Sequence, residues 1–223
     1  MIRALVFDFD GLILDTEVPI FTSWHEQFVA HGCEPVTIEE WAVEIGTAGG
    51  LDMEALLVER SRTNIDLVVA QERRRARRDE LLACETVRPG VHVWIQDARA
   101  RGWPVGIASS SSREWIDLHL ARLDLRDAFD VVVCAGDGYA AKPEPDTYLA
   151  ACAALNVDPG EALAIEDSPH GITAAKRAGL QCVAVPNAIT AQLDTSHADV
   201  VLESLAAASI ADVLATMRRS GGA

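Results

Sequence analysis

Residues 2–11 of this chain read IRALVFDFDG, a short apolar run of strand-forming residues that ends in two acids and a glycine. A continuous apolar run of this kind is typical of a strand that is buried on both faces of a parallel sheet. Asp8 and Asp10 are separated by one residue, so both carboxylates can point into one crevice at the strand end. One can then act as a nucleophile while the other transfers protons, although a plain polar turn would leave the same pattern.

Similar apolar runs recur along the chain and alternate with helical patterns. The further candidate strands cover residues 105–108, 131–134, 163–165, 182–185 and 200–202. The helical patterns between them cover residues 91–101, 112–123, 145–155 and 169–178. This alternation predicts an α/β fold with a Rossmann-like core, in which helices cover both faces of a parallel sheet.

The segment from residue 16 to residue 87 departs from this alternation, because it contains helical patterns and no convincing strand. The expected helices cover residues 18–30, 38–45, 52–62 and 66–83. The sequence Val87-Arg88-Pro89-Gly90 then has the composition of a turn back into the core. We therefore predict a catalytic core made of residues 1–15 and 88–223, and an inserted all-helical cap made of residues 16–87.

The balance of charges restricts the binding partners. The 223 residues include 34 Asp and Glu against 19 Lys and Arg, a formal net charge of −15. So acidic a chain repels nucleic acid and anionic membranes at long range, and we expect neither as a partner. An anionic small molecule must therefore be bound locally, by a metal ion, a lysine or the N-terminus of a helix. We expect a monomer or a weak oligomer.

The cysteines and the first residues indicate a cytoplasmic protein. The five cysteines are odd in number, widely spaced and without a C-x-x-C pair, which favours reduced thiols over a disulfide framework or a zinc site. The start, MIRALVFDFD, becomes charged at the eighth residue and is not typical of a signal peptide. No apolar stretch approaches the roughly 20 residues that a membrane-spanning helix needs.

Three further polar groups follow candidate strands, at the edge where ligands bind in open parallel sheets. Ser109 and Ser110 lie between a strand and a helix, where hydroxyl and backbone N–H groups can bind a phosphate. Lys142 precedes a helix and can neutralise an anion near the carboxylates. Glu166 and Asp167 are adjacent acids at a strand end, and Mg²⁺ needs only one or two carboxylates from a protein.

Each of these groups also has a structural explanation. The serines can cap the next helix through Ser111 or Ser112. Lys142 can be a solvated loop residue, which is the common fate of a lysine. Asp167 suits the start of a helix, although that does not explain the neighbouring Glu166. The combination, more than any single group, indicates a phosphate site beside a metal site.

In this order, the motifs resemble the haloacid dehalogenase superfamily over nearly the whole chain. The matching residues are Asp8-Phe9-Asp10-Gly11-Leu12-Ile13-Leu14-Asp15-Thr16-Glu17, Ser109, Lys142-Pro143 and Glu166-Asp167-Ser168-Pro169-His170-Gly171. The resemblance is closest to the β-phosphoglucomutase-like subgroup, whose helical cap is inserted just after the first motif.

The resemblance implies a phospho-aspartate mechanism. In that mechanism Asp8 attacks phosphorus, while Asp10 protonates the leaving oxygen and then activates water. Ser109, Ser110 and Lys142 are expected to bind the phosphoryl group.

The resemblance also implies a Mg²⁺ site. Its expected ligands are Asp8, the carbonyl of Asp10 and Asp167, with Glu166 close by or ligating through water. A cation is needed in any case, because a carboxylate is a weak nucleophile toward an anion until charge has been cancelled.

The reaction that fits best is hydrolysis of a small phosphomonoester, such as a sugar, nucleoside or polyol phosphate. Family mutases place a histidine in the first cap helix and an arginine in the cap loop, where this chain has Val18-Pro19-Ile20 and GTAGG at residues 46–50. A dehalogenase needs neither a metal nor a second acid at Asp10. We predict a Mg²⁺-dependent phosphatase, with a β-phosphoglucomutase-type mutase as the alternative and a non-catalytic regulatory protein as a further one.

Substrate selection is expected to depend on the cap. The candidates to face the core are Glu17, Ile20, Thr47 and Gly49. Trp24 can also face the core, although packing within the cap explains both Trp24 and Ile20 better. The run ERRRARR at residues 72–78 suits a solvated helix face; alternatively, Arg75 or Arg77 reaches the substrate.

Overall fold

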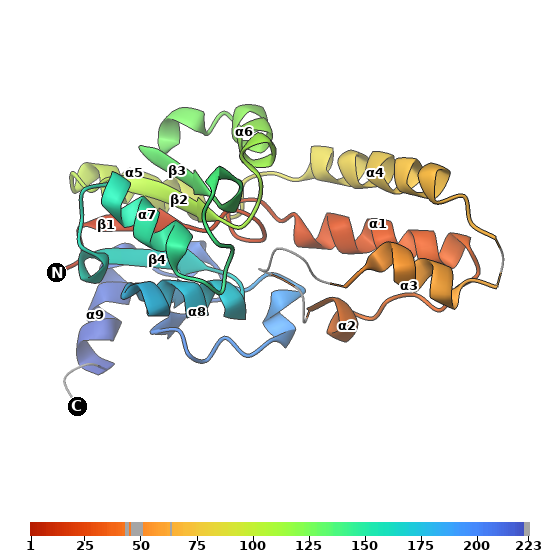
Figure 1. Cartoon of the computed structure of the whole chain (residues 1–223). Helices are drawn as coiled ribbons and strands as arrows, with labels where there is room; N and C mark the ends of the chain where they lie inside the picture. Colours follow the sequence, from red (N-terminus) through yellow and green to blue (C-terminus); the bar gives the residue numbers. More distant parts are fainter. Residues whose placement is uncertain (43–44, 46–50, 63, 221–223) are drawn as a thin grey trace.

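A parallel sheet of six strands forms the centre of the computed structural model, which describes residues 1–42, 45, 51–62 and 64–220 (Figure 1). The strands are β1 (Ala4–Phe7), β2 (Val105–Ser109), β3 (Val131–Cys134), β4 (Ala162–Glu166), β5 (Gln181–Ala184) and β6 (Val200–Val201). Their spatial order is β3-β2-β1-β4-β5-β6, and every neighbouring pair is parallel. The predicted α/β fold is confirmed.

The alternation of side chains along β1 divides the core into two layers. Leu5 and Phe7 pack on one face with apolar residues of α5 (Val91–Ala100), α6 (Arg113–Arg122) and α9 (Ile210–Ser220). Ala4 and Val6 pack on the other face with α7 (Asp146–Ala154) and α8 (Pro169–Ala178). All four side chains are fully buried, so the continuous apolar run of β1 reflects burial on both faces.

The segment between β1 and α5 forms a helical insertion. Its described helices are α1 (Glu17–Ala30), α2 (Ile38–Ala42), α3 (Met53–Arg60) and α4 (Leu67–Cys84). They lie beyond the carboxyl ends of the strands (Figure 1) and have a small core of their own. Trp24 packs in that core with Phe28 and Met53, which confirms the packing interpretation of Trp24. The described residues of the insertion contain no strand.

The two connections between the insertion and the sheet lie side by side. Leu14 forms an antiparallel bridge with Val87, and the N–H of Arg88 donates to the carbonyl of Ile13 at 2.9 Å. The Arg88 guanidinium also donates to the carbonyl of Pro186, beyond β5, at 2.9 Å. The insertion therefore leaves and rejoins the core at one point of the sheet edge.

Some features differ from the sequence-based expectation. Helix α9 has no counterpart among the predicted helices, although Ile210, Val213 and Met217 are buried at helical spacing. Helix α2 ends at Ala42, and the predicted continuation includes residues outside the described ones. The remaining short elements are 3-10 helices at Arg126–Ala128, Ala135–Asp137, Pro159–Glu161, Thr190–Gln192 and Leu205–Ala207.

All five cysteines are free thiols, and Cys84 is the exposed one. Within the ranges that the structure describes, no helix is both long and apolar enough to cross a membrane.

Candidate active site at the carboxyl edge of the sheet

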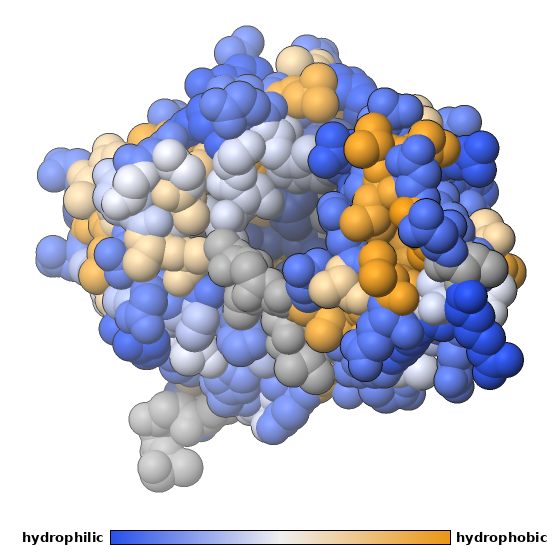
Figure 2. All heavy atoms as spheres, turned by 45° about the vertical axis from the view of Figure 1, so that its right-hand side comes forward, coloured by the Kyte–Doolittle hydropathy of each residue, from blue (hydrophilic) through white to orange (hydrophobic). Residues whose placement is uncertain are grey.

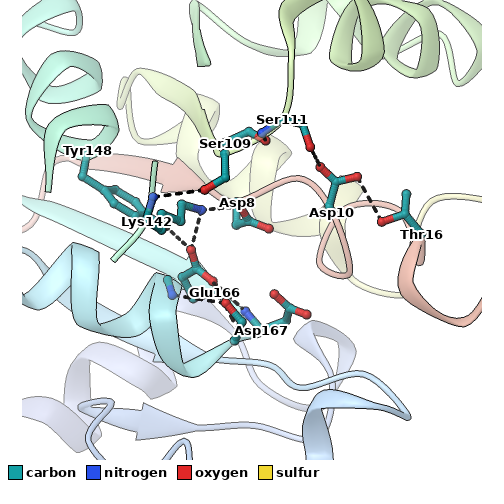
Figure 3. Close-up of polar contacts among 12 residues, drawn as sticks. Asp8, Asp10, Thr16, Ser109, Ser111, Lys142, Tyr148, Glu166 and Asp167 are labelled. Atoms are coloured by element: carbon teal, nitrogen blue, oxygen red, sulfur yellow. Dashed lines mark hydrogen bonds and ion pairs between the residues drawn. The ribbon is translucent and has the colours of Figure 1, made fainter. Parts of the chain in front are cut away.

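Four of the predicted site residues meet at the carboxyl edge of the sheet (Figure 3). Strand β1 lies between β2 and β4, so the residues that end these strands are neighbours. Asp8 directly follows β1, Ser109 ends β2 and Glu166 ends β4. Lys142 reaches them from the loop between β3 and α7, and all four side chains are buried.

Lys142 is the cation of this site. Its ammonium group forms one ion pair with Asp8 and another with Glu166, whose Oε1 lies 2.6 Å away. Burial alone would lower the pKa of Lys142, but the carboxylates of Asp8 and Glu166 raise it above its ordinary value, so the side chain stays charged. With 3% exposure, Lys142 is not a solvated loop residue, and that alternative is wrong.

Glu166 holds this lysine in place. Its Oε1 also accepts a hydrogen bond from the Tyr148 hydroxyl at 2.7 Å, and its Oε2 accepts one from the N–H of Asp167 at 3.1 Å. Gly171 lies so close to the same carboxylate that a Cβ there would overlap it. Because both of its oxygens are engaged, Glu166 is suited to orient the lysine.

Asp8, Glu166 and Asp167 form a buried acidic cluster, with one carboxylate oxygen of each within 4.8 Å of the others. Burial raises the pKa of Asp8 well above its usual range against the attraction of Lys142, and burial together with the charge of Asp8 does the same for Asp167. One ammonium group does not balance three carboxylates. The set of hard oxygen donors fits a divalent cation, with several positions left for water or a ligand.

Asp167 is held by a residue that follows β5. The Asn187 side-chain amide donates to Asp167 Oδ2 at 2.8 Å and to the carbonyl of Gly11 at 3.4 Å. Gly11 has φ +79°, and a Cβ at this position would overlap the carboxylate of Asp167. The glycine after the acid pair is therefore required both by its backbone conformation and by the close approach of Asp167.

Asp10 is bound by three donors and is separate from the acidic cluster. The Thr16 hydroxyl and the Trp115 indole N–H donate to Oδ1 at 3.0 Å and 2.8 Å, and the Ser111 hydroxyl donates to Oδ2 at 2.6 Å. These donors come from the start of the insertion and from the segment after β2. The metal contact through the Asp10 carbonyl stays a prediction.

The serines after β2 divide between capping and the site. Ser112 caps α6 by accepting a backbone N–H at 3.3 Å. Ser109 accepts the N–H of Ser111 at 3.0 Å, and Ser110 accepts the N–H of Lys142 at 3.2 Å. Ser109, Ser110 and Ser111 line the cavity above the acids, so they are available to a bound anion.

The cavity has a volume of about 150 Å³ and lies between the sheet edge and the insertion. Figure 2 shows a hollow in this surface, with hydrophobic side chains gathered on the side of the insertion. Glu17 and Ile20 line the cavity, as predicted, whereas Thr47 and Gly49 lie outside the described residues. Histidine is absent from the described lining.

The arginine run of α4 mainly makes contacts outside the cavity. Arg77 forms an ion pair with Glu26 at 2.8 Å, and Arg75 is exposed. Arg78 lies over the Trp115 ring, 5.2 Å from its centroid. None of these arginines is among the described residues that line the cavity.

Several residues that bond the acids have no counterpart among the predicted site residues, and they include Trp115, Tyr148 and Asn187. Asn187 follows the end of β5, so the rule that site residues follow strands could have found it. Trp115 and Tyr148 lie within helices, and nothing in the local sequence distinguishes them from packing residues.

The fold and this site define a Rossmann-like α/β protein with an acid pair after its first strand and a helical insertion behind that pair. The family model of haloacid dehalogenase-like hydrolases matches residues 5–185, and the chain belongs to this family. A relative named putative phosphatase YhcW, from Bacillus subtilis (strain 168), is 41% identical over 96% of this chain and 97% of its own length. Hexitol phosphatase B from Escherichia coli (strain K12) is 31% identical over 96% of this chain and 97% of its own length.

Solved structures agree with this assignment. The crystal structure of CbbY from Rhodobacter sphaeroides in complex with phosphate is 29% identical, with a TM-score of 0.74, and the match covers 96% of this chain and 99% of that one. A β-phosphoglucomutase from Clostridium difficile, 24% identical with a TM-score of 0.75, has the same fold. The named phosphatases among the relatives support a phosphoric monoester hydrolase as the enzyme class.

The contact between Gly171 and Glu166 predicts that alanine at position 171 lowers the stability of the fold. Alanine normally stabilises a helix relative to glycine, by roughly 1 kcal/mol. In Gly171→Ala, however, the new Cβ meets the Glu166 carboxylate, so we expect a loss of about 1–3 kcal/mol and a melting temperature lower by several degrees. Thermal unfolding measures this, with Gly160→Ala as the control because a Cβ there has open space. A Gly171→Ala protein as stable as the wild type would contradict the packing described.

The half-buried Glu17 gives a prediction of pH dependence. Burial, followed by the negative charge of Asp10, raises the pKa of Glu17 from 4.5 to about 7. The folded state therefore binds this proton more tightly than the unfolded state, so the stability contributed by protonated Glu17 is lost as pH rises from about 4.5 to about 7. In EDTA, Glu17→Gln should gain stability over the wild type across this interval, and exposed Glu34→Gln should not. Parallel stability curves for Glu17→Gln and wild type would refute the prediction.

Proposed function

We propose that this chain is a Mg²⁺-dependent phosphatase that hydrolyses a small phosphomonoester through a phosphorylated Asp8. The observation that carries the proposal is the position of the Asp8 carboxylate, which is buried, paired with Lys142 and within 4.8 Å of carboxylate oxygens of Glu166 and Asp167. A carboxylate fixed in this way can attack a phosphorus atom only where cations also hold the incoming dianion.

In the first half of the proposed reaction, an oxygen of Asp8 forms a bond to phosphorus while the bond from phosphorus to the ester oxygen breaks. Asp10 gives its proton to the departing alkoxide, which leaves as an alcohol. Asp10 is the suitable acid because its carboxylate faces the same cavity and is not part of the buried cluster.

In the second half, water attacks the phosphorus of the aspartyl phosphate and gives one proton to Asp10. The bond between Asp8 and phosphorus breaks, which releases inorganic phosphate and restores both carboxyl groups to their starting states. The insertion, which covers the cavity, limits the water that reaches this intermediate.

Lys142 and the serines after β2 are proposed to bind the transferred group. Ser109 and Ser110 line the cavity directly beside the lysine, and the N–H of Lys142 already donates to Ser110. The hydroxyls and the ammonium group can donate to different phosphoryl oxygens, which positions phosphorus in line with Asp8.

Asp8, Asp167 and the carbonyl of Asp10 are proposed to hold Mg²⁺, with Glu166 beside them. The bound ion supplies charge neutralisation for the phosphoryl oxygens and for the attacking carboxylate. Asn187 orients Asp167 for this role, since its side-chain amide donates to Oδ2 of Asp167.

Residues 16–87 are proposed to act as a cap that selects the leaving group. Glu17 offers an acceptor and Ile20 an apolar contact on the insertion side of the cavity, a combination that suits the hydroxyl groups and carbon skeleton of a sugar or polyol phosphate. The name of the hexitol phosphatase relative agrees with this class. Thr47 and Gly49 remain candidate substrate contacts.

Hydrolysis is favoured over the mutase reaction by the lining of the cavity. Family mutases place a histidine in the first cap helix, whereas the described residues that line this cavity include Ile20 and no histidine. Product analysis with a panel of phosphorylated sugars, polyols and nucleosides tests the choice. Free phosphate supports the phosphatase, whereas an isomerised sugar phosphate without phosphate release would overturn it.

Asp8→Asn is the direct test of the nucleophile. The amide cannot form the acyl-phosphate bond, so we expect kcat to fall at least about a thousandfold while the fold is retained. Wild-type protein should bind beryllium fluoride with Mg²⁺ as a mimic of the phosphorylated aspartate, and the variant should not. Full turnover by Asp8→Asn would remove the proposal at its root.

Metal binding should be visible without turnover. At about a hundred times its Kd, Mg²⁺ should stabilise the fold by about 2.7 kcal/mol, because it binds the folded state and not the unfolded one. The melting temperature should then rise by several degrees and return to its starting value in EDTA. Asp167→Asn should lose most of this rise, whereas Glu203→Gln, on an exposed residue, should keep it. Equal Mg²⁺ shifts in the two variants would argue against this site.

A further inference from the structure

The hydrogen bonds of Asp10 are distributed unequally between its two oxygens. Oδ1 accepts from two donors, the Trp115 indole and the Thr16 hydroxyl, whereas Oδ2 accepts from the Ser111 hydroxyl alone. A carboxylate oxygen has about two lone-pair directions, so Oδ1 is saturated and one direction remains at Oδ2. Of the three donors, the indole N–H is the one that cannot also act as an acceptor.

We propose that Trp115 is a positioning residue for proton transfer and that it assigns Oδ2 of Asp10 as the oxygen that carries the catalytic proton. The inference rests on the proposed function, in which Asp10 is the acid and base. Because the indole can only donate, Oδ1 must remain an acceptor, and a proton on Asp10 is therefore directed to Oδ2. The carboxyl group also cannot rotate without breaking the bond to Trp115.

The indole ring is itself fixed by groups from both parts of the molecule. On the core side, the His119 ring meets it edge-on, with the ring centroids 4.3 Å apart. On the insertion side, the guanidinium of Arg78 lies 5.2 Å from the indole centroid, and its side chain is 23% exposed. Helix α4 of the insertion therefore contacts the ring that holds Asp10, and Arg78 acts through Trp115.

A purely structural role for Trp115 would be to fill the space between α6 and α4. The two roles differ in how they depend on the leaving group. A nitrophenolate departs without much help from an acid, whereas an alkoxide departs only when it is protonated. Loss of proton positioning should therefore slow an alkyl phosphate much more than an aryl phosphate, while a packing defect should slow both alike.

The test compares kcat/KM of wild type and Trp115→Phe for 4-nitrophenyl phosphate and for the best alkyl phosphate of the substrate panel. Phenylalanine keeps an aromatic ring for Arg78 and His119, and it removes the N–H donor together with one ring of the indole. We expect kcat/KM to fall about tenfold or more for the alkyl phosphate and less than about threefold for the aryl phosphate. An equal fall for both substrates, or no fall for either, would overturn the inference.

Two further variants complete the design. Trp103→Phe changes a half-buried tryptophan that packs on the core and contacts Arg101, and it should leave both substrates unaffected. Arg78→Met should show the same preference for aryl phosphate as Trp115→Phe, with a smaller amplitude, and exposed Arg75→Met should not. If Arg78→Met had the same kcat/KM values as the wild type for both substrates, the proposed contribution of the insertion would be wrong.

These outcomes are separable from failure of the proposed function. If the wild type releases phosphate from neither substrate, the phosphatase assignment itself fails. If the wild type hydrolyses both and Trp115→Phe lowers both equally, the phosphatase stands and the role of Trp115 is wrong. Thermal unfolding of each variant establishes that the comparison is made on folded protein.

Discussion

An ammonium group held between two buried carboxylates is the interaction on which this site depends. Lys142 is 134 residues from Asp8 and 24 from Glu166 in the sequence, so the three charges meet only when the sheet has assembled. Buried charges are tolerated when they are paired, and removal of one partner leaves the others uncompensated. The contacts that stabilise the centre of the sheet edge are thus the same ones that position the candidate nucleophile.

The pairing at Lys142 also explains how so acidic a chain can accept a phosphate. The net charge of −15 and the raised pKa values of Asp8 and Asp167 indicate that the carboxylates of this site disfavour further negative charge beside them. A divalent cation, which this set of carboxylate oxygens fits, would change the balance together with the positive charge of Lys142. Selectivity for an anion therefore depends on the local arrangement and not on the overall field of the protein.

The strands and the polar residues at their ends could be predicted because both follow from one constraint. A strand buried on both faces has to be apolar, and the first polar residues after it must lie at the sheet edge, which located Asp8, Ser109 and Glu166. Trp115 and Tyr148 could not be predicted, because the direction of a helical side chain toward the site depends on how the helix packs on the sheet. Helix α9 was not predicted, although its apolar residues recur at regular helical spacing.

Asp8 and Asp10 are held by residues from different parts of the molecule, although only one residue separates them in the sequence. Asp8 is held by Lys142, which belongs to the core. Asp10 is held by Thr16, at the start of the insertion, and by Trp115, against which Arg78 of the insertion packs. A nucleophile has to be in place whenever a phosphate arrives. An acid that also activates water causes less unproductive hydrolysis when it is aligned only over an enclosed substrate. The unequal attachment of the two carboxylates matches that difference in their proposed roles.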